Sequence, residues 1–281
     1  MHSKFVPWML AISLLLSMMN CNAMEATPSK ENHIQNHPPS VAADHVDHPQ
    51  LVFFTFKDLH PGNIIPIYQL AINPSTSPRF LPREIADLIP FSLSKLPFIL
   101  DVFGWPRDSP EAKTIETTLK QCETPPLKGE TKYCATSLES MLSFVHKTFG
   151  TMKYKPLSTQ QAVAQSGNYL QNYTVLEAPR RVYAPKMIAC HTTRYPYLVY
   201  ICHYFVGDNQ VFKVKLRSEE TGSEMEAVAT CHMDTSEWSP DQPFLKAYGI
   251  KPGTIPVCHF FPTDNVVWVG IISGDQGSPQ I

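Results

Sequence analysis

The chain has 281 residues, of which 43% are hydrophobic and 17% are charged, and its formal net charge is −2. Its sequence contains neither a basic patch nor a polybasic run, which excludes the electrostatic surfaces by which proteins bind nucleic acids or anionic membranes. No segment recurs in tandem, so we expect one large domain and no repeat array.

The first 23 residues are typical of a secretory signal peptide. Lys4 supplies a short positive region, Phe5 to Met19 form an apolar run, and Cys21-Asn22-Ala23 resembles a small-residue cleavage site. We therefore expect residues 1–23 to be removed in the secretory pathway. No later apolar stretch reaches the roughly 18 residues of a membrane-spanning helix, so no membrane span is expected.

Residues 24–50 are predicted to be a flexible pro-segment or linker. They contain no Phe, Trp or Tyr and are rich in Pro, Asn, Asp and His. Such a segment cannot bury enough apolar surface to offset the entropy of ordering. Order is expected to begin at Leu51, where a cluster of β-favouring phenylalanines starts, so the domain is predicted to span 51–281.

Helices are predicted mainly in the first half of this domain. The region from Phe80 to Leu119 suits short helices that its prolines limit, and Ser109-Pro110-Glu111 is a good helix start. The clearest helix runs from Ser137 to Phe149, where apolar residues form one stripe. Thr136 and Glu139 are the expected capping box of this helix.

After Val175 the apolar residues alternate with a period of two, which predicts strands. Three hairpins are expected, because pairs of successive strands flank short turns at 192–196, at 219–223 and at 262–264. We therefore predict an α+β fold: an N-terminal helical region followed by a mainly antiparallel β-sheet of hairpins, stapled by disulfides.

Four Cys-His dipeptides in the last third of the chain are its most specific motif. By composition alone, His would follow four of the six mature cysteines roughly once in ten thousand sequences, so the repeat predicts a site. The dipeptides are Cys190-His191, Cys202-His203, Cys231-His232 and Cys258-His259, and the other two mature cysteines are Cys122 and Cys134.

Neighbouring residues on a strand point to opposite faces, so the sulfurs and the imidazoles should separate. An even number of cysteines in an oxidising compartment favours disulfides, although fifteen pairings of six cysteines are possible. Cys190 and Cys202 are symmetric about Pro196, so a hairpin would place them opposite each other. The remaining expected bridges are then Cys231 with Cys258, and Cys122 with Cys134.

The opposite face would hold the four imidazoles of His191, His203, His232 and His259. Imidazoles without thiolates suit copper or zinc. Asp234 follows His232 by two residues and should therefore lie on the same face of the strand. It is predicted to hold a ligating imidazole in its orientation without binding the metal itself. One alternative is a pair of zinc sites that each use two Cys and two His, but the spacing does not support it, because the sequence has no Cys-x-x-Cys and oxidation would compete. The alternative that stays open is ordinary sheet histidines beside structural disulfides.

Other catalytic motifs are absent from the sequence. It contains no Gly-x-Ser-x-Gly, no phosphate-binding glycine loop and no His-Glu-x-x-His. Asn172-Tyr173-Thr174 is an N-glycosylation sequon, and the alternative is an unmodified loop asparagine.

These motifs together resemble the plant BURP-domain family. The order Phe53-Phe54, Asp58-Leu59 and Gly62, followed by the four Cys-His dipeptides at these spacings, is similar to that family over roughly Leu51 to Val269. The short, non-repetitive segment before the domain is similar to the seed and microspore-embryo branches. Further matching segments are "FLPREIADLIPFSLSKLPFIL" (80–100), "DSPEAKTIETTLKQCE" (108–123), "CATSLESML" (134–142), "CHMDTSEW" (231–238) and "VCHFFPTDNVVWV" (257–269).

The resemblance implies two kinds of function. Some members are copper-dependent peptide cyclases that cross-link Trp or Tyr side chains, and the matching site here would be the four histidines with copper as cofactor. Other members are secreted, wall-associated or storage-vacuole proteins tied to seed development or stress, with no known reaction. Residues 24–50 contain no Trp or Tyr to cross-link. We therefore interpret the chain as a non-catalytic protein of the cell wall or protein storage vacuole, with cyclisation of a separate peptide substrate as the alternative.

Overall fold

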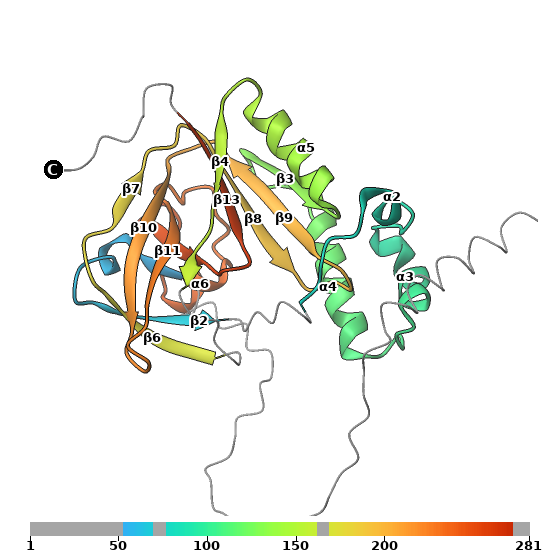
Figure 1. The fold of residues 1–281 in the computed structure, drawn as a ribbon, viewed down its shortest axis with the longest axis horizontal. Coiled ribbons are helices and arrows are strands. Elements are labelled where there is room, and N and C mark those ends of the chain that lie inside the picture. Colours follow the sequence, from blue (N-terminus) through green and yellow to red (C-terminus); the bar gives the residue numbers. More distant parts are fainter. Residues whose placement is uncertain (1–52, 70–76, 162–168, 272–281) are drawn as a thin grey trace, which may run out of the picture.

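The structure is a computed structural model that describes residues 53–69, 77–161 and 169–271 (Figure 1). The expected signal peptide (1–23) and pro-segment (24–50) lie outside the described residues, as do both ends of the predicted 51–281 domain. Within the described part, no helix is long and apolar enough to cross a membrane.

Two antiparallel sheets, A and B, form the body of the described part. Sheet A contains, in spatial order, β1 (Phe53–Thr55), β12 (Val257–Phe261), β11 (Glu224–His232), β10 (Asn209–Ser218), β6 (Tyr169–Val175) and β2 (Ile64–Gln69), with β5 (Gln160–Gln161) beside β11 and β7 (Arg180–Val182) beside β10. Sheet B contains β3 (Glu130–Ala135), β9 (Val199–Phe205), β8 (Met187–Thr193), β13 (Val266–Gly270) and β4 (Tyr154–Leu157).

All four Cys-His dipeptides lie on strands, as the alternating pattern predicts. The expected hairpins β8–β9 and β10–β11 are confirmed by their pairing registers. The third expected hairpin, from β12 to β13, does not form. Instead β12 pairs with β11 in sheet A, whereas β13 pairs with β8 and β4 in sheet B. The single expected sheet is therefore two sheets, and the chain crosses between them at 262–265.

The helices are few and short. Strands β1 and β2 precede them and β3 lies between two of them, so the chain does not run through helices first and strands afterwards. They are α2 (Arg83–Ala86), α3 (Leu96–Phe103), α4 (Pro110–Glu123), α5 (Leu138–Phe149) and α6 (Pro243–Ala247), with 3-10 turns η2 (Phe56–Asp58) and η3 (Leu93–Lys95). Of these, α2, α3, α4 and α5 lie on one side of the molecule, whereas α6 packs beside β1 and β12 of sheet A.

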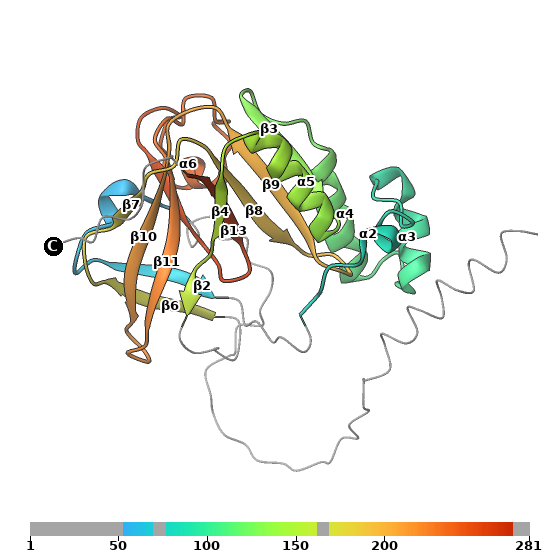
Figure 2. The ribbon, with the colours of Figure 1, turned by 45° about the horizontal axis from the view of Figure 1, so that its top comes forward.

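Helix α5 covers one face of sheet B. Its apolar stripe, including Met141, Val145 and Phe149, packs against a cluster that contains both cysteines of the β8–β9 pair. Helices α2, α3 and α4 pack around Tyr195 and Tyr197 in the β8–β9 turn. Figures 1 and 2 show sheet A on the other side of sheet B, away from α2, α3, α4 and α5. Sheet B is therefore the middle layer.

The N-terminus of α5 differs by one residue from the prediction. Ser137 is the N-cap: its hydroxyl accepts a hydrogen bond from Ser140 N–H at 3.1 Å, and the Ser140 hydroxyl accepts one from Ser137 N–H at 3.1 Å. The predicted pair Thr136 and Glu139 is therefore not the capping box. Ser137 takes the cap because it has the extended backbone (φ −146°, ψ 161°) that a capping residue needs. Helix α4 begins as predicted, with Ser109 as N-cap and Pro110 in the first turn.

Replacing the cap should test this assignment. We expect Ser137→Ala to lower the free energy of unfolding by about 1 kcal/mol, because a buried helix N–H loses its acceptor. Thr136→Ala is the matched control and should change it by less than half as much. Urea unfolding followed by circular dichroism measures both. If Thr136→Ala lowered the free energy of unfolding more than Ser137→Ala does, Thr136 would be the N-cap, as the sequence predicts.

Candidate functional site

Two cross-strand disulfides fix the geometry of the site. Cys190 lies directly opposite Cys202 in sheet B, and Cys231 lies directly opposite Cys258 in sheet A. In both pairs the Cα atoms are 4.0 Å apart, the close approach of a pair that shares no backbone hydrogen bonds. Both pairings match the prediction: hairpin symmetry predicts Cys190–Cys202, and Cys231–Cys258 is its expected partner bridge. The second bridge forms even though β11 and β12 pair without forming a hairpin.

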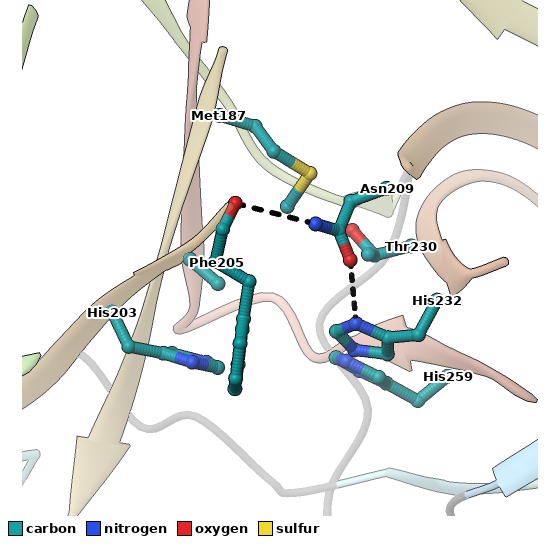
Figure 3. A pocket seen from close by; sticks show the side chains of 8 residues that line it. Met187, His203, Phe205, Asn209, Thr230, His232 and His259 are labelled. Carbon is teal, nitrogen blue, oxygen red and sulfur yellow. Dashed lines mark hydrogen bonds between the residues drawn. The ribbon is translucent and has the colours of Figure 1, made fainter. Parts of the chain in front are cut away.

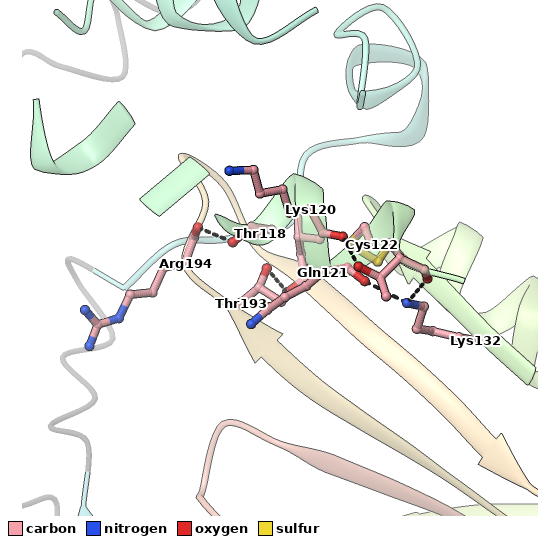
Figure 4. The surroundings of a disulfide bond; sticks show 10 residues. Thr118, Lys120, Gln121, Cys122, Lys132, Thr193 and Arg194 are labelled. Carbon is pink, nitrogen blue, oxygen red and sulfur yellow. Dashed lines mark hydrogen bonds between the residues drawn. A yellow bond between two sulfur atoms is a disulfide. The ribbon is translucent and has the colours of Figure 1, made fainter. Parts of the chain in front are cut away.

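The third disulfide, Cys122–Cys134, lies away from this site and joins the end of α4 to β3 (Figure 4). Lys132 Nζ donates to the carbonyl oxygens of Gln121 and Thr124 beside it. This pairing also matches the prediction. The bridge anchors the helical side of the molecule to the edge of sheet B.

Strand alternation places the four dipeptide histidines on the faces that look away from the sulfurs. In sheet B, His203 pairs with Ala189, and His191 pairs with Ile201, so the two imidazoles are diagonal neighbours. Sheet A repeats this arrangement with His232 and His259. The same faces carry an apolar cluster from both sheets: Met187, Ala189, Val211, Val228, Phe261, Val267 and Val269. The histidines therefore lie where the two sheets meet.

The structure brings all four predicted histidines together, and we call them the histidine cluster. Ring centroids are 5.3 Å apart for His191 and His203, 5.5 Å for His191 and His259, and 5.6 Å for His232 and His259. Imidazoles whose nitrogens lie about 2 Å from one shared ion have ring centres roughly 5 Å apart. Each of these three separations matches that of two neighbouring ligands of one ion.

The orientation of the rings is less favourable than their spacing. The planes of His232 and His259 are only 25° apart, so these two rings stack. The ring of Phe205 lies between His203 and His232, with centroids 5.3 Å and 5.9 Å from them (Figure 3). Among the described residues, no three His, Cys, Asp or Glu side chains converge in a geometry that would hold a metal ion.

A small cavity lies beside the cluster. It has a volume of about 10 Å³ and is lined by His203, Phe205, His232 and His259 among others. This is room for one ion or one water molecule. A larger groove of about 70 Å³ shares Phe205, Asn209 and His232 with it and is also lined by Trp238.

Burial keeps the imidazoles of His191, His232 and His259 uncharged. Loss of solvation lowers the pKa of His191 and of His232 well below 6.5, and the neighbouring imidazoles lower it further. Burial also lowers the pKa of His259 to about 4, although a hydrogen bond to the Phe260 carbonyl oxygen opposes this shift. Neutral imidazoles have the lone pairs that metal ligation requires.

Sequence reasoning missed the residue that orients His232. Asn209 Oδ1 lies 2.8 Å from His232 Nδ1, and the two residues are directly opposite in the β10–β11 register (Figure 3). Extending the antiparallel register of the predicted hairpin to the residue opposite His232 would have identified Asn209 from the sequence. The predicted partner, Asp234, is exposed, because β11 ends at His232 and strand alternation ends with it. Its carboxylate accepts a hydrogen bond from Ser236 N–H instead.

Asn172, the predicted glycosylation site, lies within β6 and its side chain is exposed. It therefore sits on a strand and not in a loop. It pairs with Pro66 of β2.

The sequence comparisons agree with the Cys-His framework. The family model described as "BURP domain" matches residues 52–270. The chain belongs to the BURP-domain family.

Other BURP-domain proteins of plants align over most of the chain. It is 42% identical to BURP domain protein USPL1 of Arabidopsis thaliana over 79% of this chain and 81% of that protein. It is 37% identical to BURP domain-containing protein BNM2C of Brassica napus over 92% of this chain and 94% of that protein. BURP domain-containing protein 17 of Oryza sativa subsp. japonica is 42% identical over 77% of this chain, but this match covers 38% of the rice protein.

The lowered pKa values predict that acid destabilises metal-free protein. As pH falls below about 6.5, unfolded histidines bind protons that the buried ones do not, so stability is lost down to the folded pKa. For His259 the window runs from 6.5 to about 4, and the full loss is about 3 kcal/mol.

We therefore expect His259→Gln to flatten the decrease in unfolding free energy between pH 7 and pH 4, measured by urea titration in the presence of a chelator. His146→Gln, which removes an exposed imidazole on α5, should leave the decrease unchanged. Equal slopes for wild type and His259→Gln would contradict the burial argument.

Proposed function

We propose that this BURP-domain protein binds a copper ion through its histidine cluster, in the secretory pathway, without catalysing a reaction. The observation that carries the proposal is that four imidazoles from two sheets lie next to one another, with neighbouring ring centroids 5.3 to 5.6 Å apart. Imidazole suits copper and zinc, and the six mature cysteines are held in disulfides, which argues against thiolate zinc sites. Copper is the metal that the family resemblance implies.

The residues fit such an ion in one further respect. Within the described part of the chain, every hydrogen bond or ion contact of the four imidazoles is made through Nδ1, and each Nε2 is left without one. Binding would require some rings to turn about their side-chain torsions and Phe205 to shift. A bound copper ion would supply a one-electron redox centre; the residues of the chain position it and shield it from water.

The size of the cavity supports a binding role. Its volume of about 10 Å³ leaves no room for an aromatic side chain beside the imidazoles. With the predicted signal peptide, this fits a protein of the cell wall or, alternatively, of the protein storage vacuole. Its role there would be developmental or stress-related.

Copper binding is tested by dialysing metal-free protein, purified without a His-tag, against copper and measuring retained metal. We expect about one copper per chain in wild type. In His232→Gln the affinity should fall by at least about tenfold, because a ligand and its hydrogen bond to Asn209 are lost. His146→Gln is the control and should bind like wild type. No retained copper in wild type would overturn the proposal.

A second function, peptide cyclisation in trans, is favoured by the groove of about 70 Å³ that opens beside His232. Copper-loaded protein would be incubated under oxygen with peptides that contain Trp or Tyr, digested and analysed by mass spectrometry. We expect no loss of two hydrogens from any such peptide. A loss that disappears in His232→Gln would show that the protein is an enzyme.

A further inference from the structure

Sheet A ends at an open edge that carries exposed apolar side chains. Strand β2 pairs with β6 on one side, and no other strand in the described part of the chain pairs with it. On the outward face of these two strands Ile64 is 51% exposed, Leu170 is 41% exposed, and Pro66 is exposed as well. We call these three residues the apolar strip. An open strand edge beside apolar side chains invites pairing with another chain.

Asn172 stands in the middle of the apolar strip. It is directly opposite Pro66 in the β2–β6 register, and Leu170 precedes it by two residues on the same face. Ile64 is opposite Thr174, so it is a diagonal neighbour of Asn172. Directly opposite residues on one face have Cβ atoms roughly 5 Å apart, and diagonal neighbours roughly 7 to 8 Å. A group attached to the Asn172 side chain would therefore begin among these apolar side chains.

We propose that Asn172 carries an N-linked glycan, and that its first sugar covers the apolar strip and keeps the open edge of β2 from pairing with other chains. Asn172-Tyr173-Thr174 is the only usable sequon of the chain, because the other Asn-x-Ser, at 73–75, has proline in its middle position. The methyl group and the carbon-bound hydrogens of an N-acetylglucosamine pack on apolar side chains, while its hydroxyl groups face water. The inference needs the secretory pathway, as the proposed function does, but it needs no copper.

The fold leaves room for a glycan at this position. Tyr173 points inward to the core of sheet A, as do Ile65 and Ile67 of β2. Alternation along β6 therefore directs Asn172 outward, where its side chain is exposed. Figures 1 and 2 show β2 and β6 at the border of the molecule, away from α2, α3, α4 and α5. A glycan on Asn172 therefore extends away from the core without displacing it.

The backbone around Asn172 shows that this edge is already protected at one point. The carbonyl oxygen of Asn172 accepts a hydrogen bond from Glu219 N–H at 2.9 Å, on the side away from β2. Asn172 and Pro66 are therefore a pair without mutual backbone hydrogen bonds, and the ring nitrogen of Pro66 faces the open edge. Proline there removes one N–H donor from the edge. It leaves Ile64 and Leu170 exposed, and these are the side chains that a glycan would cover.

Occupancy of the site is tested on the full chain secreted from plant cells. An amidase that releases N-linked glycans converts the carrier asparagine to aspartate, and mass spectrometry of peptides locates the change. We expect the change at Asn172 in wild type and in Thr174→Ser, which keeps the sequon, but not in Thr174→Ala, which destroys it. An unmodified Asn172 in secreted wild type would overturn this inference and leave the proposed copper site intact. Retention of the chain in the cytosol would overturn both.

Shielding is tested by light scattering at increasing protein concentration. The forms compared are glycosylated wild type, wild type trimmed by an endoglycosidase to a single N-acetylglucosamine, and Asn172→Gln, all from cells that make only oligomannose glycans. We expect the first two to keep a constant hydrodynamic size and Asn172→Gln to associate, with the same fold by circular dichroism. If Asn172→Gln is not secreted, wild type made without a glycan in the bacterial periplasm replaces it.

Two results would contradict the shielding. A trimmed form that associates like Asn172→Gln would show that the first sugar does not cover the apolar strip. An Asn172→Gln protein whose size stays constant would show that the strip needs no cover.

Further substitutions test which surface associates. Ile64→Thr and Leu170→Gln, added to Asn172→Gln, replace the exposed apolar side chains with polar ones; threonine at 170 would create a sequon with Asn168. We expect this triple variant to keep the size of wild type without a glycan. Val206→Thr, which alters a 73% exposed apolar side chain outside the strip, is the control and should not rescue Asn172→Gln. Continued association of the triple variant would show that chains pair through another surface, and it would overturn the inference.

Discussion

Everything at the candidate site depends on the alternation of side chains along four extended strands. A Cys followed directly by a His on a strand sends the sulfur one way and the imidazole the other. Each disulfide then locks its strand pair in register, and a slip by one residue would exchange the two faces. The sulfurs of the β8–β9 pair join the core under α5, and those of the β11–β12 pair join the core of sheet A. The histidines meet between the two sheets.

Placing imidazoles between packed sheets has an electrostatic cost. The protonated forms of His191, His232 and His259 are disfavoured by lost solvation and by the neighbouring imidazoles, so these three rings are neutral at ordinary pH. The structure compensates with one hydrogen-bonding or charged partner per Nδ1. These partners come from separate elements: Glu130 on β3, Asn209 on β10, the Phe260 carbonyl on β12 and Asn265 before β13.

Local pattern predicts much of this arrangement. The strands follow from alternation, the start of α4 from Ser109 and Pro110, and the Cys190–Cys202 bridge from symmetry about Pro196. These features depend on residues that are near in sequence. The division into two sheets does not, because the β12-to-β13 segment resembles a hairpin and only long-range packing separates its strands.

The partners of the imidazoles were harder to foresee for a related reason. Asp234 is close in sequence to His232, but strand β11 ends before reaching it. Asn209 is distant in sequence and adjacent in register. Phe205, which separates two of the rings, follows His203 by two residues and so shares its face. Its effect on the cluster depends on how closely sheet A approaches.

The crossing from β12 to β13 acts as a short tether between the sheets. From Phe261 to Val266 a fully extended chain spans roughly 17 Å, whereas packed sheets are already about 10 Å apart. The hydrogen bond from Asn265 N–H to the Pro262 carbonyl folds this tether and shortens it further. The sheets therefore cannot part widely at this edge while their strands stay intact. The groove past Trp238 shares Phe205, Asn209 and His232 with the small cavity, so it offers an ion a path to the imidazoles that does not require the two sheets to separate.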